Sequence, residues 1–415
     1  MIPSAKKINT QKQTNFDIVV IGGGIVGLAS AYKIQLRYPD IRIGVFEKEK
    51  HLAMHQTGHN SGVIHSGLYY KSGSYKAKNC TKGRKELIDF AAEHNIPYEI
   101  CGKIIVAADE AEVGNLEEVF QNGLENQIEG IEKIGPEQIR EIEPFCQGIA
   151  GIYVPCTGII DFKEVAKKLA ELIESKAQES LVLTCCEVTA IDKHSGIAKI
   201  TTSRGDFTTE YLINCTGLQC DRIAKMDGVK PLVKIIPFRG DYYELTEKAL
   251  RKVRNLIYPV PDPAFPFLGV HFTRMMNGVV ECGPNAVFSL KREGYGKMDF
   301  SLKDSWDSLT YPGTWKLFLR HWRYGLNEYK RAFFKGQFLE QLQRLIPSLE
   351  AQDIRPSRAG VRAQALERSG ELVDDFKIEK GVNSIHVLNA PSPAATASLA
   401  IGETVSQIAA EHFNL

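Results

Sequence analysis

Several features that define other classes of protein are absent from this chain of 415 residues. No uninterrupted apolar run approaches the roughly 18–20 residues that a membrane-spanning helix needs, and no internal repeat or low-complexity tract occurs. Lysine and arginine number 51 against 50 acidic residues, so the net charge is only +1. That balance disfavours a nucleic-acid-binding protein, which usually carries a basic excess. Any attraction for anions must therefore be local.

Cysteine motifs are also missing. The nine cysteines are scattered singly, apart from the Cys185–Cys186 pair, and no CxxC or Cys/His zinc spacing occurs. Residues 1–15 are polar and lack the apolar core of a signal peptide, so we expect a loose tail there. The odd cysteine count then predicts reduced thiols and a cytoplasmic location. The length exceeds that of one small core, which predicts two domains.

The first strong pattern is an apolar run followed by three spaced glycines. The run Ile18–Ile21 is typical of a strand buried on both faces. Gly22, Gly24 and Gly27 then form a GxGxxG pattern. The first glycine permits a tight turn, the second lets a pyrophosphate approach the backbone, and the third lets the following helix pack on the strand. The helix N-terminus offers free N–H donors to that anion.

A second apolar segment, Ile41–Phe46, is predicted to be the next strand, and it ends in Glu47. A carboxylate at this point can bond the ribose hydroxyls of an adenine dinucleotide. The order of strand, glycines, helix, strand and acid predicts a Rossmann-like α/β fold. The alternative is an ordinary glycine-rich turn in a domain that binds no nucleotide.

A loop dense in glycine, serine and histidine follows, covering His51–Ser74. It has no helical period, and its position would take it past the cofactor. His55, His59 and His65 fall within eleven positions, but no carboxylate or thiolate stands beside them and the spacing fits no common metal site. No metal is therefore predicted. His55 is expected to be structural, whereas His59 and His65 are candidates for an active site.

The segment Gly58–Tyr70, GHNSGVIHSGLYY, resembles one branch of the D-amino-acid oxidase and glycerol-3-phosphate dehydrogenase superfamily of flavoproteins, the branch that oxidises L-2-hydroxyglutarate. In that superfamily a similar loop brings serine and histidine side chains to the flavin ring. The resemblance covers nearly the whole chain beyond residue 15. It implies FAD as the cofactor and a Rossmann-like FAD-binding domain interleaved with an antiparallel-sheet α+β substrate domain.

The expected domains are discontinuous, because two excursions leave the FAD-binding domain and return to it. The predicted FAD-binding domain comprises residues 1–95, 148–227 and 356–415. The predicted substrate-binding domain comprises residues 96–147 and 228–355. A hairpin is expected in the second excursion, with its turn at Asn277–Gly278.

Later segments resemble further parts of the superfamily's flavin site. An apolar strand ends at Thr216–Gly217, where backbone contact with FAD is implied. The run Ser357–Arg362 resembles the segment whose arginine grips a substrate carboxylate, although Ala363–Gln364 replaces the proline usual in amino-acid oxidases. A helix expected to start near Ala394–Thr396 would direct its positive end at the flavin and stabilise the negative charge of the reduced ring.

The resemblance implies a set of cofactor contacts drawn from all of these segments. They are Gly22, Gly24, Ile25, Val26, Glu47, Lys48, Thr57, Gly58, Ser61, Gly62, Val188, Thr216, Gly217, Gly360, Arg362, Pro393, Ala394, Ala395 and Thr396.

The implied reaction is oxidation of L-2-hydroxyglutarate, a small dicarboxylate, to 2-oxoglutarate by hydride transfer to flavin N5. A neutral histidine suits the role of base, because its reference pKa near 6.5 lies close to working pH. The predicted catalytic histidines are His59, His65 and, third, His271. Arginine forks bind carboxylates bidentately. The predicted substrate contacts are Arg239, Arg362, Asn60 and Ser61.

Several alternatives stay open at this stage. The substrate can instead be another small hydroxy- or amino-acid, such as glycerol 3-phosphate, and a non-catalytic FAD-bound scaffold is a reading from another class. His59 can serve as a covalent attachment point for FAD, as in some related dehydrogenases. Oxygen, a quinone or an electron-transport chain would each suit the reduced flavin as acceptor.

Residues 305–347 differ in character from the rest of the chain. They hold all three tryptophans, Trp306, Trp315 and Trp322, among further aromatic side chains and interleaved lysines and arginines. Aromatics at helical spacing usually form core. The other hypothesis is a basic, aromatic helical surface on a membrane interface, which would place the protein at the inner face of the cell membrane and near a quinone.

Overall fold

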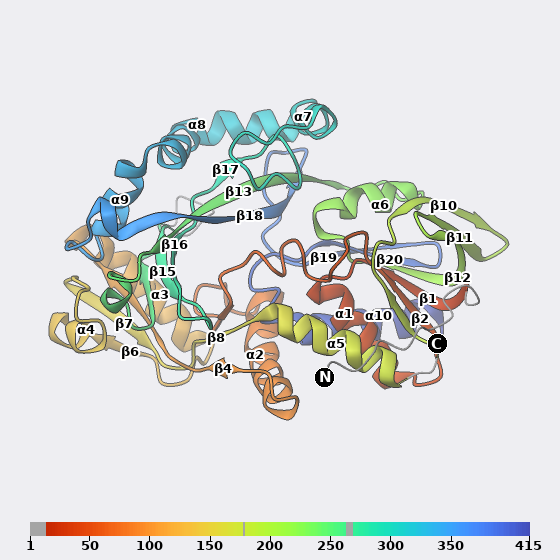
Figure 1. Cartoon of the computed structure of the whole chain (residues 1–415), viewed down its shortest axis with the longest axis horizontal. Helices are drawn as coiled ribbons and strands as arrows, with labels where there is room; N and C mark the ends of the chain where they lie inside the picture. Colours follow the sequence, from red (N-terminus) through yellow and green to blue (C-terminus); the bar gives the residue numbers. More distant parts are fainter. Residues whose placement is uncertain (1–13, 177–178, 263–268) are drawn as a thin grey trace.

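The computed structural model describes residues 14–176, 179–262 and 269–415. Most of the expected tail, residues 1–13, lies outside the described residues. The described chain forms two large sheets, a small three-stranded sheet and their covering helices (Figure 1). The predicted α/β class is confirmed: a Rossmann-like sheet with parallel central strands accompanies a second, largely antiparallel sheet.

The first sheet contains the predicted glycine-motif strand at its centre. Its order is β10 (Val188–His194), β11 (Ile197–Thr202), β12 (Gly205–Asn214), β1 (Asn15–Ile21), β2 (Ile43–Phe46) and β9 (Leu181–Leu183), and β12 also pairs β20 (Ser384–Asn389), which pairs β19 (Lys377–Gly381). The pairs of β1 with β12 and β2 are parallel. Ile18, Val19 and Val20 are fully buried, as expected for a strand covered on both faces.

Helices cover one face of this sheet. They are α1 (Ile25–Arg37), α2 (Tyr75–Glu93), α5 (Phe162–Lys176) and α10 (Ser398–Phe413). Their apolar side chains form one core with Ile18, Val20 and Val45, while Phe16, Val19 and residues of the β10–β11–β12 meander form a second core on the other face. The short helix α6 (Cys220–Met226) follows the turn η1 (Gly217–Gln219). The helix expected to begin near Ala394–Thr396 begins at Ser398 instead, after a run of turns.

The second sheet is larger and mostly antiparallel. Its order is β17 (Val287–Phe288), β13 (Val233–Leu245), β16 (Val280–Gly283), β15 (His271–Arg274), β14 (Leu256–Pro259), β5 (Lys103–Ala107), β7 (Ala150–Val154) and β6 (Glu132–Ile134), and β18 (Ile354–Glu367) pairs β13. The expected hairpin at Asn277–Gly278 is confirmed, since β15 and β16 pair antiparallel and Gly278 has a φ of +81°. The small sheet joins β3 (Val63–Ile64), β8 (Gly158–Ile160) and β4 (Tyr98–Glu99).

The remaining helices lie around this second sheet. They are α3 (Glu110–Glu125), α4 (Pro136–Ile142), α7 (Leu302–Leu309), α8 (Pro312–Phe333) and α9 (Lys335–Gln343), with the short turns η2 (Leu250–Lys252) and η3 (Ala351–Asp353). Figure 1 shows α7, α8 and α9 along the outer edge above β13 and β18. The helix α8 bends at His321, whose φ and ψ are not helical.

Two strands belong to a different sheet from the one that the predicted domain boundaries imply. β7 lies within residues 148–227 and most of β18 within 356–415, which the prediction assigned to the FAD-binding domain, yet both pair in the second sheet. The reason is pairing at long range: β18 runs antiparallel to β13 along nearly its whole length. A resemblance in the short motif around Gly360 could not reveal that register.

Candidate active site

One cavity of about 960 Å³ is lined by residues from both large sheets and from the histidine-containing loop. The glycine turn after β1 and the end of β12 contribute to it, as do β13, β18 and the segment before α10. Segments that are hundreds of residues apart thus meet at one space. Of the predicted cofactor contacts, Gly58, Gly62 and Thr396 do not line it, and of the predicted substrate contacts Arg239 does not.

The turn after β1 has the geometry of an anion cradle. Gly22 has a φ of +113°, and a Cβ there would lie 2.6 Å from the carbonyl oxygen of Cys215. A Cβ on Gly27 would lie 2.1 Å from the carbonyl oxygen of Gly22, so α1 packs against the turn only with glycine at this position. Gly24 is the N-cap of α1 and supplies no side-chain cap. Thr57 Oγ1 accepts from the N–H of Ile25 at 3.0 Å, so an anion would bind the N–H groups that follow Ile25 in the first turn.

The Glu47 carboxylate is buried beside this cradle. Its two oxygens accept hydrogen bonds from the backbone N–H of Gly23 (2.8 Å) and of Glu49 (2.9 Å). Each carboxylate oxygen can accept a further bond. The carboxylate is therefore oriented, and it has the remaining capacity that ribose hydroxyls require.

The loop between β2 and β3 is held to the second sheet by an arginine that the sequence analysis passed over. Arg358 donates to the carbonyl oxygens of Gly58 and Asn60, both at 2.7 Å, and pairs with Glu281 at 2.6 Å. Thr396 holds the other side of the loop, since its hydroxyl donates to Val63 O (3.1 Å) and accepts from His65 N (3.1 Å). Both contacts fix the loop at the cavity wall.

Asn60 and Ser61 line the cavity as predicted donors, but the amide of Asn60 is already committed. Its Nδ2 donates to the carbonyl oxygens of Gln56 and Thr57, and its Oδ1 accepts from Gly62 N at 2.8 Å. The side chain thus stabilises the loop from within. Ser61 is the better placed of the two for a ligand.

All three predicted histidines line the cavity, and each has a lowered pKa. Burial is the main cause in each case, and it takes the pKa of His65 to about 3 and that of His271 to about 4. Burial and the charges of Arg358 and Lys163 lower the pKa of His59. The three imidazoles are therefore neutral at pH 7.

Two of these histidines have a fixed tautomer. Nδ1 of His59 lies 2.7 Å from the carbonyl oxygen of Ala359, and Nδ1 of His271 lies 2.9 Å from that of Gly269. A carbonyl can only accept, so each Nδ1 carries the hydrogen and each Nε2 keeps a lone pair. His59 also packs its ring on Tyr295, with 4.4 Å between ring centroids. Both Nε2 atoms can accept a proton.

The two predicted arginines are placed differently. Arg362 of β18 lines the cavity and donates to Asn285 O at 3.3 Å. Arg239 of β13 is buried in an ion pair with Asp241 (2.9 Å) and donates to Gly296 O at 2.7 Å. Side chains alternate along a strand, and it is the neighbouring Gly240 that faces the cavity. We therefore leave Arg239 out of the proposed substrate site.

The cavity wall also contains side chains that sequence reasoning missed. Four tyrosines line it: Tyr69, Tyr70, Tyr242 and Tyr258. Lys103 of β5 is buried directly behind two of them, with its Nζ 4.7 Å from the ring centroid of Tyr69 and 4.8 Å from that of Tyr258. A charged residue at the start of the otherwise apolar run Lys103–Ala107 was the one available signal.

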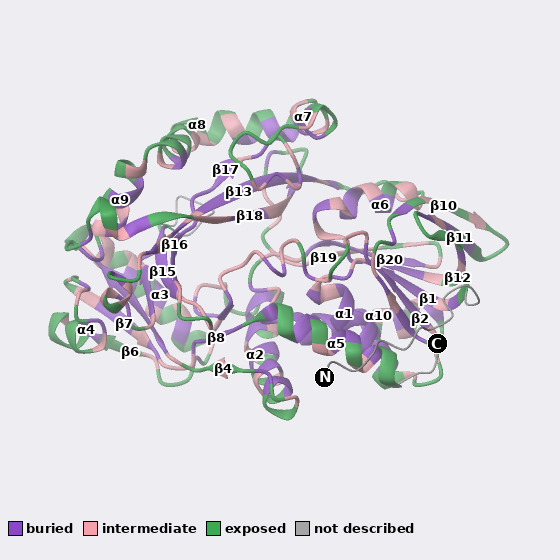
Figure 2. Ribbon diagram, in the orientation of Figure 1, coloured by how far each residue is buried: buried purple, intermediate pink, exposed green. Residues whose placement is uncertain are grey.

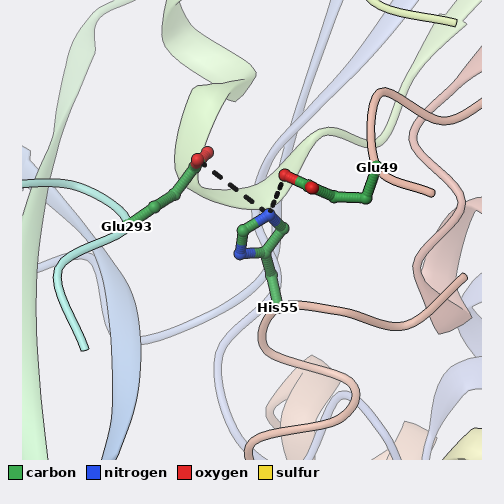
Figure 3. A group of neighbouring side chains, drawn as sticks. All are labelled: Glu49, His55 and Glu293. Atoms are coloured by element: carbon green, nitrogen blue, oxygen red, sulfur yellow. Dashed lines mark hydrogen bonds and ion pairs between the residues drawn. The ribbon is translucent and has the colours of Figure 1, made fainter. Parts of the chain in front are cut away.

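Figure 3 shows that His55 lies between two carboxylates, Glu49 and Glu293. Glu49 stands only six residues before His55, but Glu293 comes from a segment 238 residues further on than His55, so the pair of carboxylates was not predicted from the sequence. Lys48 Nζ pairs with both carboxylates, at 3.1 Å and 2.5 Å, and Nδ1 of His55 bonds the Tyr295 hydroxyl at 2.8 Å. The group is thus an ion-pair network that joins the loop after β2 to the segment that follows β17.

The chain is similar to known proteins over nearly its whole length. A family model described as FAD dependent oxidoreductase matches residues 17–408. The chain is 49% identical over 400 residues to an L-2-hydroxyglutarate dehydrogenase of Indibacter alkaliphilus, covering 96% of this chain and 100% of the relative. It is 44% identical over 419 residues to the human mitochondrial L-2-hydroxyglutarate dehydrogenase, covering 97% of this chain and 90% of that one.

Solved structures share the fold. An L-α-glycerophosphate oxidase from Mycoplasma pneumoniae with FAD bound has a TM-score of 0.76 at 23% identity and covers 97% of this chain and 95% of its own. A glycine oxidase from Geobacillus kaustophilus has a TM-score of 0.71 at 15% identity, with 96% and 95% covered.

Proposed function

The chain belongs to the family of FAD-dependent oxidoreductases, and we propose that it oxidises L-2-hydroxyglutarate to 2-oxoglutarate. The observation that carries the proposal is that the dinucleotide cradle and a pocket with neutral histidines and an arginine are parts of one cavity. The relatives that match over nearly the whole chain are named for the same substrate.

The residues of the cradle fit FAD. The start of α1, where Gly24 has no side chain, and the close turn at Gly22 suit a pyrophosphate, and Glu47 suits the adenosine ribose. When bound, FAD supplies the hydride acceptor for C2 of the substrate. The chain's own task is to hold the substrate, exclude water and take the hydroxyl proton.

The base in this proposal is one of the three cavity histidines. His59 and His271 each present Nε2 with a free lone pair, because a backbone carbonyl accepts the hydrogen of Nδ1. His65 is the third candidate, and its low pKa makes it the weakest proton acceptor of those with a stated value. A positioned base contributes about 10²–10⁴ in rate.

The substrate carboxylates need cationic partners, and Arg362 is the proposed one. Its guanidinium is always charged and can bond a carboxylate through two parallel N–H donors. Ser61 is a neutral donor on the same wall. A water-excluding cavity strengthens these charge-assisted bonds relative to the same bonds in water.

Anaerobic mixing of the holoenzyme with L- or D-2-hydroxyglutarate tests the proposal. The L-enantiomer should bleach the flavin absorbance within seconds and yield 2-oxoglutarate, and the D-enantiomer should bleach it at least 100-fold more slowly. Glycerol 3-phosphate and small amino acids form the control panel. If one of these compounds reduces the flavin faster than L-2-hydroxyglutarate, the proposed substrate is wrong.

We also propose that α8 rests on an anionic membrane surface, where a quinone would reoxidise the flavin. Within residues 305–347, Phe338 does pack in the core of the second sheet. The tryptophans do not: Trp306, Trp315 and Trp322 are 71%, 54% and 54% exposed, and Figure 2 colours much of α8 as exposed. Among the described residues no helix combines the length and apolar content needed to cross a membrane. Contact would therefore be peripheral.

The exposed apolar side chains of α8 follow a helical spacing. They are Trp315, Leu319, Trp322, Leu326, Tyr329 and Phe333. The exposed cations Lys316, Arg320, Arg323 and Lys330 each stand one position after a member of that series. An apolar stripe beside a basic one is the pattern of helices that lie in a membrane interface with anionic lipid.

Flotation of the intact protein with phosphatidylglycerol-containing vesicles tests this contact. The Trp315→Ala/Trp322→Ala double variant should lose most of the membrane-bound fraction. The control is Leu232→Ala/Val382→Ala, which removes apolar side chains that are exposed elsewhere. Equal partitioning of wild type and the tryptophan variant would exclude the membrane contact and favour a protein partner for this face.

A further inference from the structure

Lys103 is a cation buried within the second sheet. Its side chain belongs to a residue that is 2% exposed, and within the ranges 14–176, 179–262 and 269–415 no carboxylate lies within ion-pair distance of it. Burial of an ammonium group without a counter-ion is costly, and lysine is almost never buried unless it is paired. Such a position calls for a compensating interaction.

The surrounding side chains compensate only in part. The rings of Tyr69 and Tyr258 flank Nζ at cation–π distance, and such contacts recover only part of the desolvation cost. The hydroxyl of Tyr69 is buried without a hydrogen-bond partner among the described residues. Burial raises the pKa of Tyr258, and the neighbouring hydroxyls of Thr273 and Ser61 oppose that rise.

The Lys103 ammonium group nevertheless lies against the wall of the substrate cavity and acts electrostatically on side chains that line it. Tyr69 and Tyr258 form part of the cavity wall, and so do His65 and His271. The ring of Tyr258 packs on that of His271, with 4.1 Å between centroids. The charge of Lys103 helps to lower the pKa of both histidines. One layer of tyrosine therefore separates the charge from the space that a ligand would fill.

We propose that Lys103 is a positioning residue that selects a dicarboxylate substrate, because its charge lies behind the tyrosine wall and no anion of the described chain pairs with it. The inference rests on the proposed function. A bound dianion brings the missing negative charge into the adjoining cavity, and a monocarboxylate brings only half of it. Attraction between charges several ångströms apart at a protein effective dielectric of about 20 corresponds to roughly 10- to 50-fold in affinity.

The charge of Lys103 should vary within an accessible pH range. Burial lowers its pKa to about 8, against small opposing contributions from the thiols of Cys156 and Cys80. Burial raises the pKa of the Cys80 thiol to about 12 and also raises the pKa of the Cys156 thiol.

The other groups that face Lys103 do not change charge between pH 7 and 10. Burial puts the pKa values of His65 and His271 far below this range and those of Tyr69 and Tyr258 above it. Arg84, which influences both thiols, keeps its charge throughout. Substrate affinity should therefore fall above about pH 8, as Lys103 loses its proton.

The experiment compares two five-carbon ligands on the full-length holoenzyme. L-2-hydroxyglutarate is measured by the concentration dependence of anaerobic flavin reduction, and L-2-hydroxypentanoate, which lacks the distal carboxylate, by competition against it. Lys103→Met should weaken binding of the dicarboxylate by roughly 10- to 50-fold and, because half the charge gives half the free energy, binding of the monocarboxylate by only about 3- to 7-fold. An equal loss for both ligands would show a merely structural role and overturn the proposal.

Lys103→Arg supplies the second arm. Arginine keeps its charge to above pH 12, so the loss of dicarboxylate affinity that wild type shows above pH 8 should disappear in this variant. Identical pH profiles for wild type and Lys103→Arg would overturn the proposal even if Lys103→Met fails to fold or retain FAD. If wild type is not reduced by L-2-hydroxyglutarate at all, the proposed function has failed, and the two failures are thereby distinguished.

Discussion

The cofactor part and the substrate part of the cavity are built in contrasting ways. The cradle is made by consecutive residues, with Gly22, Gly24 and Glu47 on one strand–turn–helix–strand unit. The substrate wall is assembled from strands that are far apart in the sequence, since Lys103 meets Tyr258 only because β5 pairs with β14. The residues of the cradle depend on one another because they share one backbone turn. The side chains of the substrate wall come from separate strands, so one of them can be replaced while the others stay as they are.

This contrast indicates which part of the cavity determines substrate specificity. The same cradle can serve many reactions, because it contacts only the cofactor. The second sheet provides the side chains that distinguish one substrate from another. Variants in the wall should therefore change the chemistry and leave FAD in place.

The largest effect is expected from the histidines. Replacing His59, His65 and His271 by glutamine, one at a time, should reveal one variant whose rate of flavin reduction falls by about 10²–10⁴ because the base is lost. Stopped-flow absorbance gives the rate, and the FAD content of each variant should stay at the wild-type level.

The control for the histidine series is His194→Gln, an exposed position on β10, which should behave as wild type. Unchanged reduction rates in all three cavity variants would remove the histidines as candidates for the base. A protein that stays yellow after acid precipitation, and loses that colour in His59→Gln, would instead assign His59 to covalent attachment of FAD.

A smaller effect should separate the two arginines of the β13–β18 pair. Arg362→Met should weaken L-2-hydroxyglutarate binding by roughly 10- to 150-fold, because a charge-assisted bond worth about 1.5–3 kcal/mol is lost. Arg239→Met should leave affinity unchanged but lower stability by about 3–5 kcal/mol, since it leaves Asp241 buried without its partner.

Substrate titration and urea unfolding measure the two quantities for each variant. If Arg239→Met weakens substrate binding as much as Arg362→Met does, then Arg239 belongs to the substrate site after all. In that case Arg239 would face the substrate in the working enzyme, and not Asp241 as in this structure.

The smallest effect concerns the network that joins the two regions. Burial raises the pKa of Glu293, but its bonds with Lys48 and Gln219 and the charge of Lys48 outweigh this, so the pKa lies below the usual 4.5. A lowered folded-state pKa contributes stability above pH 4.5 that is lost as the pH falls through the folded-state value. Glu293→Gln should therefore cost about 1 kcal/mol at pH 7 and progressively less below pH 4.5.

Thermal unfolding across this pH range gives the measurement, with the exposed Glu132→Gln as the matched control. A stability difference that does not vary with pH would show that Glu293 acts by packing and not by its charge.

The sequence allowed the cradle to be predicted in detail because its physics is local. A buried strand needs an apolar run, so Ile18–Ile21 predicted the strand. The helix can approach the turn only at a residue without a side chain, so Gly27 predicted the close packing of the helix. The C-terminal helix was predicted with its start a few residues early, because the turns before Ser398 carry no sequence signal for the first helical hydrogen bond.

The substrate wall was only partly predictable. His59, His65 and Arg362 stood in segments that resemble known ones, but whether Arg239 faces the cavity depends on the pleat of β13, which a short motif does not specify. Tyr258 and Lys103 become neighbours through a pairing between strands about 150 residues apart. No local sequence pattern predicts such a contact.

The pairing of β20 with β12 and the packing of α10 on α1 have a consequence for biosynthesis. The strand that completes the cofactor sheet and the threonine that holds the histidine loop leave the ribosome long after the glycine turn. A nascent chain that ends before Ser384 therefore has an incomplete FAD site, and FAD capture should wait until these residues have emerged. Ribosome-bound chains stopped at residue 383 should retain no FAD, and released full-length chains should acquire it.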